Sequence, residues 1–531
     1  MEERLSRISP VDTVKLSDKV LEFLSRSSQT SFQLHQRKPS EVTQTFTTSF
    51  NPTKKQLQAQ ASRYQNQIRK SSNQHFRIHV SADSSAGSFT IPATITSSRG
   101  NKAQLATDGH LSGKTIAAIT VSGREDITAV AEKREQVILM ILQGKIDAEG
   151  TGINPWCQYI FLHTGENFAW PTEWVKETTS IQFKPKAIPR PLNASQIDAI
   201  HSMLQQTNDS RVTIIQGPPG TGKTTVIASF VQTAIAAGKR GIWLIAQSNI
   251  AVKNIAEKLA DFNLLNWKLL VSNQFYEFWH EHLYTTIKTN TIISEDFQDS
   301  HLLFSKLSGC PVILCTLSML SSFMLHKLGV FRDFPLQTVV IDEASQIEIG
   351  DYIPLFNGFT TIRKVIFIGD DKQLPPHGQE DVKELQSIFE VEHLKSQITF
   401  LNTQYRMPPQ IGKFISQAVY QEQLLSNSGH PLADTGDTVC HFVNVAAGQQ
   451  ISQGTSLKNV EECKAILLLA SIFQAEHKSF KIITPYDAQR TLLENALKEA
   501  ELEWGDTCFN VDSFQGLLFF VFTAFEFLIN S

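Results

Sequence analysis

The stretch that determines the fold reads Ile214-Ile215-Gln216-Gly217-Pro218-Pro219-Gly220-Thr221-Gly222-Lys223-Thr224-Thr225. Two β-branched residues end a predicted strand, a loop with the spacing G-x-x-x-x-G-K-T follows, and Val226 to Phe230 opens a predicted helix. This is the P-loop pattern in the strand–loop–helix context that it requires. The alternative is a Gly/Pro turn that happens to precede a helix, but the complete pattern favours a site for a nucleoside triphosphate.

The P-loop pattern assigns a chemical role to each of its residues. The glycines let successive backbone N–H groups point toward a phosphate chain, and the helix start adds a positive partial charge. Lys223 is expected to reach the β- and γ-phosphates, and the Thr224 hydroxyl to bind Mg²⁺. The predicted nucleotide-binding residues of the loop are Gly217, Gly220, Thr221, Gly222, Lys223, Thr224 and Thr225.

The composition is that of a folded protein that works inside the cell. The chain has 531 residues, of which 41% are apolar, and its net charge is −4. The six cysteines form no C-x-x-C pair, which argues against a zinc module and favours a reducing compartment, the nucleus or the cytoplasm. The start of the chain lacks a signal-peptide pattern and the longest apolar run is too short to span a bilayer, so we expect no membrane association. The weak net charge does not by itself indicate a polyanionic partner.

The first part of the chain divides into two predicted regions. Residues 1–75 are polar and basic and read as a largely disordered extension with one short amphipathic helix at Val14–Leu24. Residues 76–186 read as a small β-rich accessory module of short alternating strands, Trp156–Phe161 among them. One helix, Glu125–Leu142, is expected inside this module.

Two proline residues at Pro189 and Pro191 mark the start of an α/β region. Continuous apolar strands alternate there with helical stretches, which predicts a doubly wound parallel sheet with both faces covered. We assign residues 187–395 to a first α/β domain, which carries the P-loop, and residues 396–531 to a second α/β domain, which is incomplete. The predicted strands are Thr213–Gln216, Gly241–Ala246, Val312–Thr316, Thr338–Asp342 and Val365–Gly369, with Lys481–Thr484 the clearest strand of the second domain.

Two acids follow the strand Thr338–Asp342 directly. Asp342 and Glu343 are expected at the carboxyl edge of the sheet, where the P-loop also lies. Asp342 suits Mg²⁺ coordination, and Glu343 suits polarising the water that attacks the γ-phosphate. A solvated acidic turn is the alternative. The position of the acid pair after a P-loop in the chain indicates hydrolysis of the nucleotide as well as binding.

A third strand, Val365–Gly369, ends in Asp370-Asp371-Lys372-Gln373-Leu374-Pro375-Pro376. Its polar end is expected beside the nucleotide, where Gln373 could contact both the γ-phosphate and the attacking water. The alternative is a loop that two prolines bring to an end.

The order of four motifs resembles that of a superfamily 1 helicase. These are Gly217–Thr224, Asp342-Glu343-Ala344-Ser345-Gln346, Gly369–Pro376 and Gln404-Tyr405-Arg406-Met407-Pro408, which resemble motifs I, II, III and IV. The branch is the one typified by the nonsense-mediated mRNA decay helicase and its DNA-acting relatives. The resemblance extends over about three-fifths of the chain, and the joint order and spacing of its motifs make it specific.

The resemblance implies roles for further residues. It implies two RecA-like domains that close over ATP, with Gln196 reading adenine, Tyr405 packing near the base and Arg406 acting as an arginine finger. Ordinary roles remain open for each: a polar residue at a helix start, a core aromatic and a surface arginine. Ala246–Val252 resembles motif Ia and Cys315-Thr316 resembles a further motif that binds the nucleic-acid strand, so Ser248, Asn249 and Thr316 are implied to hold single-stranded RNA or DNA through its phosphates. Movement is implied to be 5′ to 3′, and we expect a monomer.

The resemblance stops at Gly516. The segment Val511–Gly516 resembles a late motif of the second domain, but Leu517–Ser531 is apolar and no motif VI with a second arginine finger follows. We therefore expect a chain truncated before motif VI.

Three functions remain to be compared. The first is an ATP-dependent helicase or translocase with Mg²⁺; the second is a helicase-like protein that binds ATP and nucleic acid with weak or no turnover. The third is a GTPase, which the absence of an Asn-Lys-x-Asp element disfavours. The sequence favours the first.

Overall fold

A computed structural model of the chain describes most of the 531 residues. They form two compact units, which divide between Asp434 and Thr435. Most of the motif Val511–Gly516 and of the segment Leu517–Ser531 lies outside the described residues. The described residues are 16–38, 40–44, 47–51, 55–60, 74–81, 89–99, 102–107, 111, 115–124, 127–145, 154–163, 168–175, 181, 191–273, 287–433, 441, 443–453, 456–505, 507–511 and 523–524.

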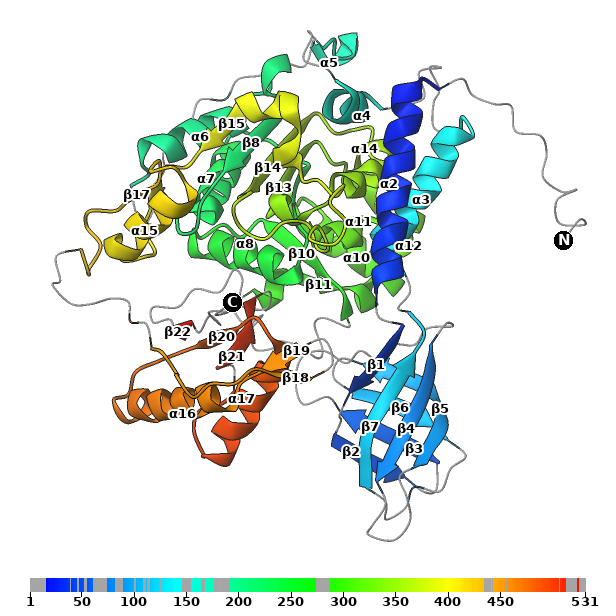
Figure 1. Cartoon of the computed structure of the whole chain (residues 1–531). Helices are drawn as coiled ribbons and strands as arrows, with labels where there is room; N and C mark the ends of the chain where they lie inside the picture. Colours follow the sequence, from blue (N-terminus) through cyan, green and yellow to red (C-terminus); the bar gives the residue numbers. More distant parts are fainter. Residues whose placement is uncertain are drawn as a thin grey trace, which may run out of the picture. The chain divides into compact units, whose positions relative to one another are not determined.

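The first unit contains an eight-stranded parallel sheet with the strand order β11-β10-β12-β9-β13-β14-β8-β15 (Figure 1). Its strands are β8 (Val212–Gln216), β9 (Ile242–Ala246), β10 (Trp267–Val271), β11 (Thr291–Ile293), β12 (Val312–Thr316), β13 (Thr338–Asp342), β14 (Lys364–Gly369) and β15 (Ile398–Phe400). All five strands predicted for this region are present, and the predicted α/β class is confirmed. β10, β11 and β15 were not predicted.

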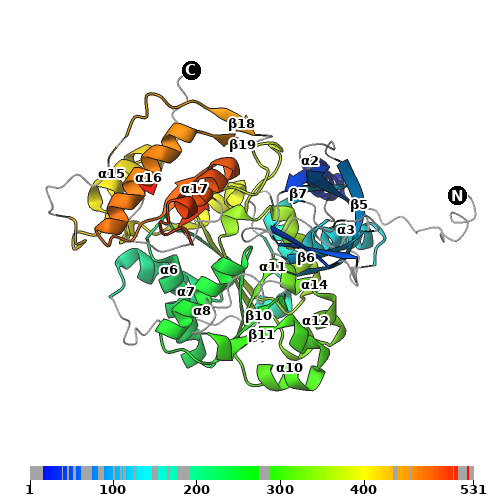
Figure 2. The ribbon, with the colours of Figure 1, turned by 90° about the horizontal axis from the view of Figure 1, so that it is seen from below.

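Both faces of this sheet are buried. Successive side chains of each strand point to opposite faces, and the side chains on each face lie in a hydrophobic core. Ile245, Ile341 and Phe367 belong to one hydrophobic core, whereas their neighbours Leu244 and Val340 belong to the other. The second core is covered by three helices that lie side by side in both views (Figures 1 and 2). These are α6 (Ala194–Leu204), α7 (Lys223–Ala236) and α8 (Asn249–Asp261).

An antiparallel β-rich module precedes this sheet in the chain, with the strand order β1-β7-β4-β5-β6-β3-β2. Its strands are β1 (Glu41–Gln44), β2 (Thr47–Asn51), β3 (Gln56–Gln60), β4 (His75–Ser81), β5 (Phe89–Arg99), β6 (Lys102–Ala106) and β7 (Thr115–Ser122). The module has a small core of its own, which includes Leu57, Ile78 and Leu105. Helix α2 (Asp18–Arg37) precedes it and α3 (Ala129–Leu142) follows it; the two helices are joined by a hydrogen bond from Ser28 Oγ to Glu135 Oε2 of 2.7 Å.

The structure differs here from the predicted disordered extension over residues 1–75. Helix α2 and strands β1, β2 and β3 all lie before residue 75. The pattern of these strands is weak, because in β3 only Leu57 and Ala59 are buried and they alternate with glutamines. Strands β5, β6 and β7 lie inside the predicted β-rich region, although β6 was not predicted individually, and α3 corresponds to the predicted helix Glu125–Leu142.

The segment Trp156–Phe161 was predicted as a strand and is helical. Helix α4 (Pro155–Cys157) continues into a π-helical turn, Gln158–Leu162. The side chain of Asn154 accepts a hydrogen bond from Trp156 N at 2.9 Å and Pro155 occupies the first turn, so the pair starts a helix. The apolar run resembles a strand because Trp156 and Ile160 are buried in a large core.

The segment after residue 396 also differs from its predicted domain. β15 pairs with β8 of the first sheet, and the residues up to Asp434 belong to the first unit. The segment also contains β16 (Thr403–Gln404), α15 (Pro409–Val419) and β17 (Leu425–Ser426). Arg406 is therefore part of the same unit as the P-loop.

The second unit has a small α/β core. Strand β20 (Ile482–Thr484) pairs in parallel with β21 (Cys508–Asn510) on one side and with β22 (Thr523–Ala524) on the other. Its two long helices are α16 (Val460–Ala475) and α17 (Asp487–Glu499). Among the described residues of the whole chain, no helix has the length and apolar character needed to cross a membrane.

Candidate nucleotide site

The P-loop follows β8 and continues into the first turn of α7. Its tight winding depends on left-handed backbone at Gly220 (φ +76°) and Gly222 (φ +84°). Lys223 folds back over the loop, and its Nζ donates a hydrogen bond to Gly217 O at 2.8 Å. The ammonium group thus lies against the loop that the sequence predicts to hold phosphates.

Other groups approach this loop so closely that only glycine fits. A Cβ at Gly217 would lie 2.5 Å from Lys223 Cγ, and a Cβ at Gly220 would lie 2.5 Å from Arg406 Cβ. A Cβ at Gly222 would lie 2.7 Å from Gln196 Nε2. The three glycines therefore bring Gln196, Lys223 and Arg406 against one loop.

A chain of hydrogen bonds links Gln196 to both the P-loop and Tyr405. Gln196 Nε2 donates to Thr221 O at 2.9 Å, and its Oε1 accepts from Asn193 N at 3.1 Å. Asn193 Nδ2 donates to the Tyr405 hydroxyl at 3.0 Å, and Tyr405 N donates to Gly220 O at 2.9 Å. Each polar atom of the Gln196 amide keeps one further hydrogen-bonding position, so a base can still be recognised.

The two predicted acids follow β13. Asp342 is buried, and this desolvation, together with the charge of Glu343, raises its pKa to about 7, although Lys223 acts in the opposite direction. Glu343 has a left-handed backbone (φ +52°), a conformation that is costly for a residue with a side chain and that clusters at functional sites. A buried carboxylate that faces a lysine suits a site that binds a divalent cation and a triphosphate.

Thr224 and Thr225 lie in the first turn of α7, directly after Lys223, and both are half-buried. The donor set for Mg²⁺ and a triphosphate is therefore a hydroxyl, a carboxylate, an ammonium group and the loop N–H groups. These residues fit ATP and Mg²⁺, with Thr224 and Asp342 as the candidates to hold the metal.

Arg406 reaches this site from the segment between β16 and α15. The residue is exposed overall, but the protein around its guanidinium lowers its pKa, while the carboxylate of Glu343 opposes this change. Its backbone is held by the fully buried Gln404, whose Oε1 accepts from Arg406 N at 2.9 Å and from Met407 N at 2.7 Å. The effect of Glu343 on the pKa of Arg406 places these two charged groups near each other in the site.

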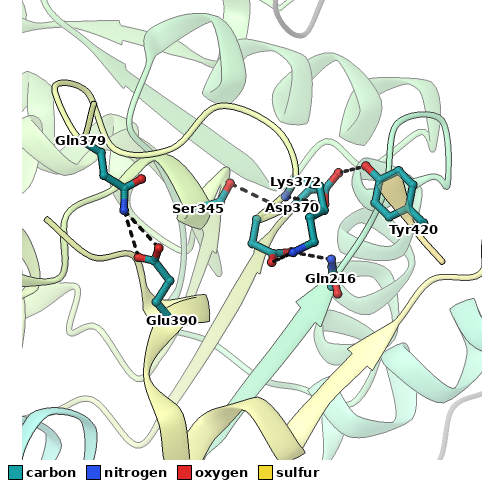
Figure 3. A network of polar contacts seen from close by, with 8 residues as sticks. Gln216, Ser345, Asp370, Lys372, Gln379, Glu390 and Tyr420 are labelled. Atoms are coloured by element: carbon teal, nitrogen blue, oxygen red, sulfur yellow. Dashed lines mark hydrogen bonds and ion pairs between the residues drawn. The ribbon is translucent and has the colours of Figure 1, made fainter. Parts of the chain in front are cut away.

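Gln373 is positioned by Asp370 at the end of β14. Its Nε2 donates to Asp370 Oδ2 at 2.8 Å, and Asp370 itself is fully buried. The same carboxylate accepts from the Tyr420 hydroxyl at 2.6 Å, and Asp370 N donates to Ser345 Oγ at 3.3 Å. Figure 3 shows Ser345, Asp370 and Tyr420 in this network, next to Gln216.

The residues predicted to contact nucleic acid lie at the ends of two neighbouring β-strands. Ser248 follows β9 and its side chain accepts from Ala251 N at 3.1 Å, which caps α8 just before Asn249. Thr316 ends β12 and accepts from Met319 N at 3.3 Å, which caps α11 (Leu317–Leu320). β9 pairs with both β12 and β13, so these caps share the sheet edge with Asp342.

Four residues of this site received no role from the sequence, although Asp370 and Gln404 lie inside quoted motifs: Asn193, Asp370, Gln404 and Tyr420. The spacing Asn193-x-x-Gln196 is a capping-box pattern, which could have revealed the contact with Gln196. No sequence signal connects Asp370 with Tyr420, because the contact joins two segments that are distant in the chain.

A parallel sheet with a P-loop after one strand and an acid pair after another defines a P-loop nucleoside triphosphatase fold. Two family models match the chain, each described as an AAA domain: one covers residues 191–273 and 285–378, the other residues 384–518.

Curated relatives match over most of the same region, and one of the three described below is named as a helicase. The regulator of nonsense transcripts 1 homolog of Arabidopsis thaliana is 26% identical over 65% of this chain and 30% of its own length. The ATP-dependent helicase NAM7 of Saccharomyces cerevisiae is 27% identical, over 61% of this chain and 37% of its own. The DNA-binding protein SMUBP-2 of Rattus norvegicus is 27% identical, over 61% and 38%. The chain thus spans about a third of the length of these relatives. It belongs to the superfamily 1 helicases, in the branch of the nonsense-mediated mRNA decay helicase.

Proposed function

We propose that this chain is an ATP-dependent helicase or translocase that moves along single-stranded nucleic acid. The observation that carries the proposal is the meeting of Lys223, Asp342, Glu343 and Arg406 in one unit, where the charges of Lys223 and Glu343 act on the pKa of Asp342 and that of Glu343 acts on the pKa of Arg406. This set combines a phosphate-binding cation, a metal-binding carboxylate, a candidate base and a candidate arginine finger.

Each residue of the set has a defined task in the proposed hydrolysis. The loop amides and Lys223 bind the phosphates, and Arg406 stabilises negative charge on the γ-phosphoryl group. Glu343 orients the attacking water and accepts its proton, and Gln373 contacts the γ-phosphate. Thr224 and Asp342 would hold Mg²⁺, which would supply positive charge against the negative charge of the phosphates.

We propose that the single-stranded nucleic acid crosses the edge of the β-sheet at Ser248, Asn249 and Thr316. Helix α8 begins at this edge, and the N-terminus of a helix of this length attracts phosphate groups. Contacts to phosphates do not read bases, so both RNA and DNA are substrates to be tested. The direction proposed from the family resemblance is 5′ to 3′.

The test is steady-state ATP hydrolysis by the 531-residue chain with and without single-stranded RNA or DNA. Lys223→Ala should abolish turnover and weaken nucleotide binding, whereas Glu343→Gln should abolish turnover and keep binding. The matched control is Lys258→Ala on α8, which removes a partly exposed lysine that pairs only weakly with Asp261, at 3.9 Å.

Strand-stimulated turnover that both site variants remove would support the proposal, and the strand that stimulates more identifies the substrate. Nucleotide binding that depends on Lys223 but comes without turnover would refute a motor and leave a binding protein. Equal behaviour of Lys223→Ala and Lys258→Ala would refute the nucleotide site itself.

A further inference from the structure

We propose that the Tyr420 hydroxyl is a positioning group that, through the buried Asp370 carboxylate, fixes Gln373 and the Arg406 segment around the γ-phosphate. The inference rests on the proposed function, and it adds a residue from outside every motif found in the sequence.

Asp370 is the centre of this arrangement. It is fully buried and receives hydrogen bonds from the Tyr420 hydroxyl at 2.6 Å, from Gln373 Nε2 at 2.8 Å and from Lys372 N at 3.3 Å. A buried carboxylate needs such donors, because an unpaired charge in the interior is costly. Each donor therefore restricts where the carboxylate can lie, and Tyr420 provides the shortest of the three bonds.

The position of Asp370 determines the orientation of Gln373. One N–H of the Gln373 amide is committed to Asp370, which leaves the second N–H and the carbonyl oxygen for other partners. A phosphate oxygen and a water molecule are the partners that the proposed mechanism requires. If the carboxylate rotates, the amide rotates with it and both contacts are lost.

Tyr420 also connects this carboxylate with the segment that carries Arg406. Tyr420 directly follows α15, whose chain begins just after Arg406 and Met407. Gln404 closes the start of this segment, because its amide also donates to Met407 O and to Ser426 Oγ, each at 2.9 Å. The hydrogen bonds of Gln404 thus hold the start of the segment, and the hydrogen bond from Tyr420 to Asp370 holds the end of its helix.

The geometry around Tyr420 is that of a buried, specific contact. Its side chain is buried, with its ring 6.3 Å from that of Phe400. Burial and the hydrogen bond to Asp370 raise the pKa of the Tyr420 hydroxyl, so it donates at every physiological pH. Tyr420→Phe removes the hydroxyl and keeps the ring.

The test compares binding of ADP with binding of the β,γ-imido analogue of ATP, both with Mg²⁺, to the 531-residue chain. Gln373→Ala should weaken the analogue about tenfold, the loss of one hydrogen bond to a charged group, and leave ADP unchanged. Tyr420→Phe should produce the same selective loss, and it should have no further effect in the Gln373→Ala background. Turnover of Tyr420→Phe should fall in kcat rather than rise in KM.

Tyr352→Phe is the matched control, since the Tyr352 hydroxyl is also buried but has no hydrogen-bond partner in the described part of the chain. It should leave both affinities unchanged. Wild-type affinities in Tyr420→Phe, beside a selective loss in Gln373→Ala, would overturn the inference and leave the proposed function intact.

Two further outcomes also count against the inference. Equal weakening of ADP and the analogue, additive with Gln373→Ala, would show that Tyr420 acts only on the stability of the fold. Failure of the wild-type chain to bind either nucleotide would refute the proposed function, and the inference with it.

Discussion

Replacement of Arg134 by methionine should strongly destabilise the first unit. Arg134 lies on α3, and its Nη1 contacts Glu348 Oε2 and lies 3.2 Å from Asp351 Oδ1. The side chains are 3%, 9% and 21% exposed respectively, so the group is an ion triad removed from water. Burial raises the pKa of Glu348 to about 7 although the nearby Arg134 lowers it. The variant keeps much of the apolar stem and leaves two carboxyl groups facing each other.

The expected loss follows from the burial of the triad. Removal of one partner from a buried ion pair costs about 3–5 kcal/mol. The cost should depend on pH, because a carboxyl group whose pKa is raised on folding stabilises the folded state below its unfolded pKa and loses this effect as pH rises through the folded pKa. Without Arg134 the pKa of Glu348 rises above 7, so Arg134→Met should be less destabilising at pH 6 than at pH 8.

Urea unfolding followed by tryptophan fluorescence measures this effect. Trp156, Trp170 and Trp174 lie in the same hydrophobic core as Val137 and Ile141 of α3, so their emission reports on the helix. Lys133→Met, one residue before, is the matched control for charge loss. Addition of Glu348→Gln to Arg134→Met should restore much of the stability.

The reasoning is refuted if Arg134→Met and Lys133→Met unfold at the same urea concentration at both pH values. It is also refuted if Glu348→Gln gives no recovery, because the loss would then come from packing rather than from the unpaired carboxylates.

Three further substitutions test other close contacts. Gly220→Ala requires a left-handed backbone at alanine, which costs about 1–2 kcal/mol, and it places a Cβ 2.5 Å from the Cβ of Arg406. The affinity for ADP, measured by titration, should therefore fall at least about tenfold. An unchanged affinity would contradict the loop geometry. Lys364→Met removes a buried amino group whose Nζ lies within hydrogen-bond distance of three backbone carbonyl oxygens and the Thr213 hydroxyl, and it should lower the free energy of unfolding in urea by about 3 kcal/mol. Gly350→Ala places a Cβ 2.6 Å from Glu348 Oε2 and should cost about 1–3 kcal/mol without removing a charge; stability equal to wild type would show that the triad can move.

The sheet of the first unit could be predicted because its strands carry an unambiguous pattern. Thr338–Asp342 is entirely buried, and a short run of apolar β-branched residues that ends in an acid is typical of a parallel strand covered on both faces. The P-loop was equally clear, since its spacing depends on the backbone conformations that Gly220 and Gly222 adopt. These features depend on local sequence alone.

The first strands of the β-rich module and the short helix α4 were harder to predict because their local sequence signal is weak or ambiguous. In β3 the burial of Leu57 and Ala59 is too small a signal to distinguish a strand from a polar linker. At Trp156 the apolar run dominated over the Asn154-Pro155 start of the helix, because the tryptophan is buried in either conformation.

The position of Arg406 shows why motif order alone does not fix the boundary of a domain. The sequence assigns Arg406 to the second α/β domain, yet Leu401 N donates to Gln216 O and Tyr405 N donates to Gly220 O, both at 2.9 Å. Two backbone hydrogen bonds to the strand and loop of the nucleotide site hold the residue in the first unit. Backbone amides carry no side-chain signal, so no pattern in the sequence could reveal them. The contact follows instead from Gly220, since only a residue without a Cβ leaves space for the Arg406 segment against the P-loop.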